Sequence, residues 1–295
     1  MPGPGPGPGM TGALTCDTKV AQPLDQDLTL MVGGVERRYQ LHVPASYDPH
    51  QATPVVLNFH GLGSNATQQK FFSRMIDKSD AEGFIAVHPD GTGTGRQSWN
   101  GAGCCDAALA NDVDDVGFVA AILDAVEKEL CVDTRRVYAT GMSNGGFMSH
   151  RLACDLSARI TAIAPVAGVN AMGDSCKPAR AVPMMQFHGT MDMLVPYDGM
   201  PQYGFPPVVK MFGDWAKRDA CTDGTPKETF KKDDTTCQSY TACGNGAEVI
   251  LCTVDGGGHT WPGGIPVASL GKTTDAISAT DAMWTFFMRH QLPAK

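Results

Sequence analysis

The pentapeptide Gly141-Met142-Ser143-Asn144-Gly145 contains a serine flanked by two glycines in the pattern Gly-x-Ser-x-Gly. It lies between an apolar run typical of a strand and a stretch with helical character, the context in which this pattern indicates a nucleophile. The glycines permit a sharp turn that raises the serine hydroxyl at a helix N-terminus. An ordinary capping serine is the alternative, but the context favours Ser143 as the nucleophile.

A serine nucleophile requires hydrogen-bond donors for the oxyanion of its tetrahedral intermediate. The sequence His60-Gly61-Leu62-Gly63 directly follows an apolar run. We expect the backbone N–H of Leu62 to form an oxyanion hole with that of Asn144, the residue after the nucleophile. We expect His60 to brace this loop, because a catalytic histidine normally follows the serine in this arrangement.

The acid and the base are expected further along the chain. Asp192 follows an apolar run, and His259 lies in a glycine-rich loop. In this order Asp192 would fix the tautomer of His259, which would take the proton from Ser143. Asp198 is the alternative acid, and His188 is interpreted as a hydrogen-bonded histidine at a strand end.

The four tryptophans fall into two groups. Trp99 and Trp261 lie in motif loops, where an aromatic face could stack on a phenolic acyl group or on a polyester. We interpret both as substrate-binding, with loop packing as the alternative. Trp215 and Trp284 lie on helical stripes and are expected in the core.

The ten cysteines form an even set with no paired C-x-x-C modules, which favours disulfides over zinc. Disulfides persist in oxidising compartments, so a secreted or periplasmic location is expected. Residues 237–243 and 247–252 resemble the strands of a β-hairpin. A turn centred on Gly244 and Asn245 would place Cys237 opposite Cys252, within reach of a disulfide.

The remaining pattern alternates apolar strand-like runs with helical stripes, which predicts an α/β fold with a mostly parallel sheet covered by helices on both faces. Residues 36–43 resemble an edge strand. Buried strands are expected at 54–60, 83–89, 136–140, 160–166 and 183–187. Helices are expected at 67–81, 112–130, 207–219 and 274–290, and from the Ser143 turn to about 152. The glycine-rich segment 90–110 is too long for a simple connector, so we expect it to be functional.

The start of the predicted helix 112–130 contains three aspartates. Asp112 is expected to cap the helix, with Asp114 and Asp115 in its first turn. A calcium site is the alternative, but the spacing is not that of an EF-hand loop.

Length and charge limit the class of protein. At 295 residues with a formal net charge of −8, the chain fits one large domain and lacks the basic surface that nucleic acid requires. Its longest apolar runs are strand-sized, so no membrane span is expected. Residues 1–12 are expected to be a disordered Pro/Gly linker or cloning-derived sequence, and 13–295 a single catalytic domain.

Six ordered segments carry a resemblance to a known family: HGLGSN (60–65), SWNGAGCCD (98–106), NDVDDVGF (111–118), GMSNGG (141–146), HGTMD (188–192) and GGHTWPG (257–263). Over about residues 30–290 the chain resembles the polyhydroxybutyrate depolymerase and feruloyl esterase family of extracellular α/β-hydrolase esterases. The resemblance implies a Ser143, Asp192 and His259 triad with no metal and no organic cofactor. It also implies disulfides Cys154–Cys176 and Cys221–Cys243, which would leave Cys16, Cys104, Cys105 and Cys131 to pair among themselves.

These expectations together predict a secreted serine esterase with an acyl-enzyme mechanism. Feruloyl esters of plant polysaccharide are the preferred substrate, and a polyhydroxyalkanoate or other polyester, or acetyl xylan, is the alternative. A peptidase and a non-catalytic binding protein are the remaining rivals.

Overall fold

The computed structural model describes Cys16, Lys19 and residues 25–293. The predicted linker at 1–12 lies outside the described residues. No helix in the described part of the chain is long and apolar enough to cross a membrane.

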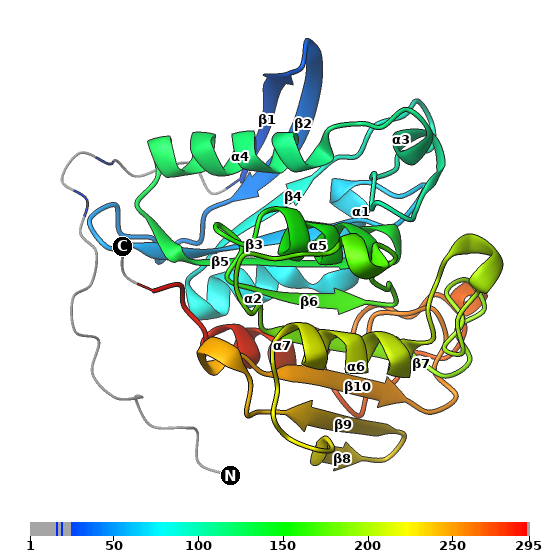
Figure 1. Cartoon of the computed structure of the whole chain (residues 1–295). Coiled ribbons are helices and arrows are strands. Elements are labelled where there is room, and N and C mark those ends of the chain that lie inside the picture. Colours follow the sequence, from blue (N-terminus) through cyan, green and yellow to red (C-terminus); the bar gives the residue numbers. More distant parts are fainter. Residues whose placement is uncertain (1–15, 17–18, 20–24, 294–295) are drawn as a thin grey trace.

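Among the residues that the structure describes, a ten-stranded sheet forms the centre, in the order β1-β2-β4-β3-β5-β6-β7-β10-β9-β8 (Figure 1). The six strands from β4 to β10 are parallel, and antiparallel strands extend the sheet on both sides. Their bounds are β1 Asp25–Val32, β2 Val35–His42, β3 Thr53–Phe59, β4 Ile85–Pro89, β5 Val132–Met142, β6 Ala162–Val166, β7 Met184–Gly189, β8 Lys227–Lys232, β9 Thr235–Tyr240 and β10 Val249–Val254.

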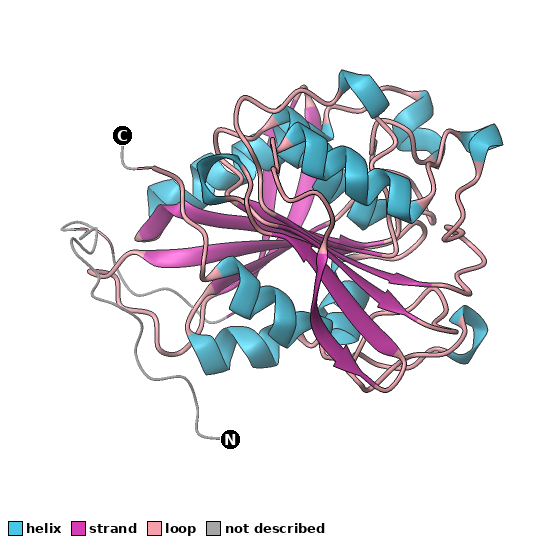
Figure 2. Cartoon of the chain, turned by 60° about the horizontal axis from the view of Figure 1, so that its bottom comes forward, coloured by secondary structure: helices cyan, strands magenta, loops and turns pink. Residues whose placement is uncertain are grey.

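Helices cover both faces of this sheet, as Figure 2 shows. One core lies under α4, α5 and α6, and the other lies under α2 and α7. The helices are α1 Ala66–Ser73, α2 Met75–Glu82, α3 Asp106–Ala110, α4 Asp115–Glu129, α5 Asn144–Asp155, α6 Val208–Arg218 and α7 Ala279–Phe287. This arrangement confirms the predicted α/β class.

Helix α6 illustrates how the sequence selects its buried face. Its buried residues are spaced three and four apart, which is the period of an amphipathic helix, and they are Val208, Met211, Phe212, Trp215 and Ala216. Trp215 and, in α7, Trp284 are both buried in the core, as predicted.

Two strands are absent from the sequence-based prediction. Strand β1 has no buried residue, and β8 is a charged edge strand whose side chains are mostly exposed. Leu28, Leu30 and Val32 of β1 pack against the core but are only partly buried, and Phe230 is the single apolar residue of β8, so neither strand forms a run of buried apolar residues. The predicted edge strand at 36–43 is β2, and β1 occupies the edge beside it.

Three helix predictions differ from the structure. The helix expected at 67–81 is divided into α1 and α2 at Arg74, which has a left-handed backbone with φ of 52°. The helix cap is Asp114, whose carboxylate accepts a hydrogen bond from Gly117 N–H, and not Asp112. The last helix is confined to Ala279–Phe287 and is shorter than expected.

All ten cysteines form disulfides. The cross-strand pair Cys237–Cys252 is confirmed, with the two residues opposite each other in β9 and β10. The pairs Cys154–Cys176 and Cys221–Cys243, implied by the resemblance, are also present. The other four cysteines form Cys16–Cys131 and the adjacent pair Cys104–Cys105. Five disulfides are typical of an extracellular protein.

Candidate active site

Ser143 lies at the sharp turn between β5 and α5. Its backbone has φ of 57° and ψ of −123°, a conformation rare for residues other than glycine. A Cβ at Gly145 would lie 2.1 Å from the carbonyl oxygen of Phe59, and one at Gly141 would lie 2.6 Å from the same atom. Both positions therefore require glycine for the turn to pack against β3.

Asp192 and His259 come from the loops after β7 and β10 and meet in a buried hydrogen bond. His259 Nδ1 lies 2.7 Å from Asp192 Oδ2. The other carboxylate oxygen accepts hydrogen bonds from the backbone N–H groups of Leu194 and Val195, at 2.9 and 2.8 Å. Burial opposes ionisation of Asp192, but the hydrogen bond and charge of His259 leave its pKa below the usual value. The ionised carboxylate is therefore positioned to accept the hydrogen bond that His259 Nδ1–H donates.

The alternative acid does not occupy this position, because Asp198 is exposed. His188 is buried below the pair, where its Nε2 donates to Val195 O at 2.8 Å and its Nδ1 accepts from the Gln186 amide at 3.2 Å. Burial lowers the pKa of His188, which keeps the ring neutral. The strand-end interpretation of His188 agrees with these contacts.

His60 braces the loop that follows β3. Its Nδ1 donates to Gly61 O at 2.7 Å, and its Nε2 accepts from Gly91 N–H at 2.9 Å. Burial lowers the pKa of His60. Both ring nitrogens are thus engaged by backbone, which leaves neither for proton transfer at Ser143.

Ser143 and His259 open into one cavity of about 360 Å³. Within the described residues no hydrogen bond joins Ser143 Oγ to His259, and this contact is commonly long in hydrolases without substrate. The other lining residues are Gly61, Leu62, Ser64, Gln69, Phe72, Arg96, Cys104, Cys105, Met142, Leu194, Val195, Phe205 and Leu270. Most of this wall is apolar.

Two backbone N–H groups are candidates for an oxyanion hole, one from the residue that follows Ser143 and one from a residue that lines the cavity. Asn144 is the first residue of α5, where backbone N–H groups have no partner within the helix. Leu62 lies in the turn after β3 and lines the cavity. Their placement suits donors to an oxyanion formed at Ser143.

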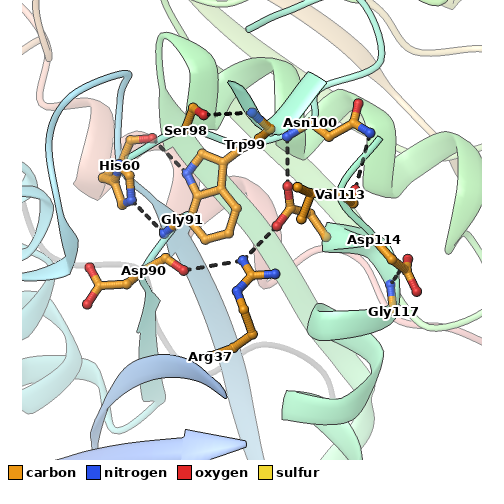
Figure 3. A network of polar contacts seen from close by, with 12 residues as sticks. Arg37, His60, Asp90, Gly91, Ser98, Trp99, Asn100, Val113, Asp114 and Gly117 are labelled. Atoms are coloured by element: carbon orange, nitrogen blue, oxygen red, sulfur yellow. Dashed lines mark hydrogen bonds and ion pairs between the residues drawn. The ribbon is translucent and has the colours of Figure 1, made fainter. Parts of the chain in front are cut away.

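Trp99 does not line this cavity, which corrects its predicted substrate contact. Its side chain is 0% exposed and packs edge-on against Phe59, with ring centroids 5.3 Å apart. Its Nε1–H donates to His60 O at 3.0 Å, as Figure 3 shows. The loop-packing alternative therefore describes Trp99.

Trp261 is also buried, and its Nε1–H donates to Thr280 Oγ1 at 3.0 Å. It lines a smaller apolar cavity of about 30 Å³, which shares Phe72, Met142 and Leu270 with the larger one. Trp261 therefore lies behind residues that line the main cavity. A direct contact between Trp261 and substrate stays a prediction.

Several residues of the cavity wall were not predicted from the sequence. Phe205 and the Cys104–Cys105 pair line the cavity, as do Leu194 and Val195, which follow Asp192 in the chain. Phe205 gives no sequence signal, because it lies in an irregular segment with no periodic pattern. Leu194 and Val195 could have been found from their distance of two and three residues from Asp192.

Comparisons with known proteins define the class. The structure of an acetyl xylan esterase from Aspergillus awamori has a TM-score of 0.63 with 15% identity, over 89% of this chain and 99% of that one. A model of the prolyl oligopeptidase family matches residues 69–177. The fold is that of the α/β-hydrolases.

Two relatives narrow the class to a family. The chain is 34% identical over 239 residues to feruloyl esterase B of Piromyces equi, covering 76% of this chain and 42% of that protein. It is 30% identical over 283 residues to putative esterase NocK of Nocardia uniformis subsp. tsuyamanensis, covering 88% and 81%. The chain belongs to the family of α/β-hydrolase esterases that includes this putative esterase, and it spans less than half the length of the Piromyces equi feruloyl esterase. The polyhydroxybutyrate depolymerase part of the resemblance stays a prediction.

Proposed function

We propose that this chain is a secreted or periplasmic serine esterase that hydrolyses feruloyl esters through an acyl-enzyme, carried by a single catalytic domain over residues 13–295. The observation that supports this most strongly is the common cavity of Ser143 and His259, with His259 hydrogen-bonded to Asp192. The arrangement fits the roles of nucleophile, base and orienting acid.

The proposed reaction begins at the ester carbonyl. Ser143 Oγ attacks the carbon while His259 Nε2 takes the serine proton, since Nδ1 carries the proton donated to Asp192. The N–H groups of Leu62 and Asn144 stabilise the resulting oxyanion. His259 returns the proton to the leaving alcohol oxygen, and the acyl group remains on Ser143.

Water completes the cycle. His259 takes a proton from a water molecule as its oxygen attacks the acyl carbon, and the second tetrahedral intermediate then expels Ser143 Oγ. His259 returns that proton to the serine, which releases a carboxylic acid and restores the resting state. Atoms and charge balance with one water consumed per ester.

Support for a phenolic acyl group comes from the cavity and from the relatives. A volume of about 360 Å³ lies within the usual range for small-molecule sites, and Phe72, Val195 and Phe205 provide apolar walls for a ring. The name of the Piromyces equi relative indicates the same acyl class. Acetyl xylan and polyesters are the alternatives.

A release assay tests the substrate. Methyl ferulate, acetylated xylan and polyhydroxybutyrate are incubated separately with the wild-type protein and with Ser143→Ala, and the acids released are measured. We expect ferulate release from wild type at the highest kcat/KM and none above background from the variant. Release from the polyester alone would contradict the feruloyl assignment but would leave the esterase mechanism standing.

Amide cleavage is the second candidate, because the matched family model is that of prolyl oligopeptidases. The test compares an ester and an amide that share the same acyl group and the same aromatic leaving group. We expect rapid ester hydrolysis with little amide hydrolysis, and comparable kcat/KM values for the two would favour the peptidase.

A further inference from the structure

Trp99 contacts both chain segments that border the nucleophile. Its indole Nε1–H donates to His60 O at 3.0 Å. Its backbone N–H donates to Asn144 Oδ1 at 2.7 Å, and its backbone carbonyl accepts from Asn144 Nδ2 at 2.9 Å. One residue is thus hydrogen-bonded to the loop after β3 and to the first residue of α5.

These two segments supply the two proposed oxyanion donors. His60 lies two residues before Leu62, and Asn144 is itself the second donor. The value of an oxyanion hole depends on donors held at hydrogen-bond distance from the developing charge before the reaction begins. A displacement of about 1 Å in such groups can cost about 100-fold in rate. Efficient catalysis therefore requires that the distance between the Leu62 and Asn144 N–H groups stays fixed.

We propose that Trp99 is a positioning residue that fixes the separation of the Leu62 and Asn144 N–H groups. The proposal rests on the esterase function proposed above. Trp99 acts from outside the cavity, because its side chain is 0% exposed and does not reach the substrate side. Its indole spans the gap to the His60 carbonyl, while its backbone is clamped by the Asn144 amide.

The loop that carries Trp99 is held in place by contacts of the next residue. The next residue, Asn100, donates its backbone N–H to Asp115 Oδ2 at 2.7 Å, and Asp115 Oδ1 is 2.6 Å from Arg37 Nη2. The Arg37 guanidinium also lies 4.0 Å from the ring centre of Phe118 and 6.0 Å from that of Trp99, and Figure 3 shows Arg37 beside the indole. The loop that carries Trp99 is therefore anchored to β2 and α4.

The test variant is Trp99→Phe, which keeps an aromatic ring and removes the hydrogen bond to His60. With methyl ferulate, or with p-nitrophenyl acetate if ferulate is not the substrate, we expect kcat to fall about 10- to 100-fold with KM within about twofold. The affinity for a trifluoromethyl ketone, which forms a tetrahedral adduct with the serine, should fall in parallel with kcat. Ferulate as a product inhibitor should bind as it does to wild type.

Trp215→Phe is the matched control. Trp215 is equally buried, and its Nε1–H donates to His150 Nδ1 at 3.1 Å under α6. This variant loses a comparable hydrogen bond outside the oxyanion segments, so its thermal stability should fall while kcat stays at the wild-type value. An equal loss of kcat in both variants would show that Trp99 acts through general stability, which would overturn the proposal.

A second variant removes the hydrogen bonds between Trp99 and the Asn144 side chain. Asn144→Ala keeps the backbone N–H and removes both side-chain contacts to Trp99. If Trp99 and Asn144 act as one unit, the losses of kcat in the single variants and in the double variant will be non-additive. Additive losses, or unchanged kcat in Trp99→Phe, would contradict the proposal. Loss of all activity in Ser143→Ala, measured in the same assay, shows separately whether the esterase function holds.

Discussion

Arg37 and Asp115 form an ion pair in which Arg37 Nη2 lies 2.6 Å from Asp115 Oδ1, with side chains only 5% and 0% exposed. Burial raises the pKa of Asp115, and the charge of Arg37 acts against this effect. A buried pair of this kind costs much to break, because the remaining charge loses its partner without regaining water. It joins β2 to the start of α4.

Asp115→Asn should lower the free energy of unfolding by about 3 kcal/mol, because Arg37 would remain buried without an opposite charge. Urea denaturation measures this change. Asp114→Asn is the matched control, since Asp114 is an exposed N-cap and asparagine caps helices equally well. Equal losses in the two variants would contradict the assigned importance of the buried pair.

Gly145→Ala should prevent the turn at Ser143 from packing against β3. The added Cβ would lie 2.1 Å from the backbone oxygen of Phe59, which cannot move without disrupting β3. We expect a loss of several kcal/mol, or insoluble protein, together with loss of esterase activity. Gly213→Ala is the control, because a Cβ there meets nothing within 4 Å in helix α6 and should raise stability by about 0.5–1 kcal/mol. A soluble Gly145→Ala protein with full activity would refute the steric argument.

Much of the site could be predicted because its residues follow strand ends in a fixed order. Ser143, Asp192 and His259 come from the loops after β5, β7 and β10, and the carboxyl ends of parallel strands converge at one edge of the sheet. The order along the chain therefore restricted the candidates for each role. Cys237 and Cys252 were predictable for a similar reason, because a hairpin fixes which residues face each other.

Other features depend on tertiary contacts that leave no local pattern. Trp99 and a substrate-stacking tryptophan would have the same sequence context, and only the burial of the indole against Phe59 distinguishes them. The cap at Asp114 could not be separated from Asp112 by residue type, since aspartate suits either position. In the structure the Asp112 carboxylate instead accepts a hydrogen bond from Asn100 Nδ2 at 3.1 Å, and Asp114 caps the helix.

The lowered pKa of Glu248 predicts that the free energy of unfolding decreases in acid. Burial disfavours its charge, but hydrogen bonds from His290 and Arg289, at 3.0 and 2.7 Å, lower its pKa from 4.5 to about 2. Because the folded-state pKa is the lower one, the stabilisation is present above about pH 4.5 and is lost as pH falls toward 2. Over that window wild type should lose about 3 kcal/mol relative to Glu248→Gln. Parallel stability curves for the two proteins between pH 5 and pH 2 would contradict this assignment.

The Cys16–Cys131 disulfide joins residues 115 positions apart and ties the N-terminal part of the chain to the start of β5. Replacing both cysteines by serine should lower stability by about 2–5 kcal/mol, since a long loop is no longer closed in the unfolded chain. Thermal unfolding under oxidising conditions measures this loss. Activity at 25 °C should persist, because neither cysteine lines the cavity shared by Ser143 and His259. An unchanged melting temperature would show that the bond does not constrain the unfolded state.

Hydrolysis of p-nitrophenyl acetate by wild type, Ser143→Ala and Ser149→Ala tests directly whether Ser143 is the nucleophile. Ser149 lies in α5, the helix that follows Ser143; it is buried and donates its hydroxyl to Gly145 O at 2.9 Å, so it controls for the loss of a nearby serine. We predict that Ser143→Ala lowers kcat by a factor on the order of 10⁴ or more while Ser149→Ala stays close to wild type. Wild-type turnover in Ser143→Ala would show that Ser143 is not the nucleophile.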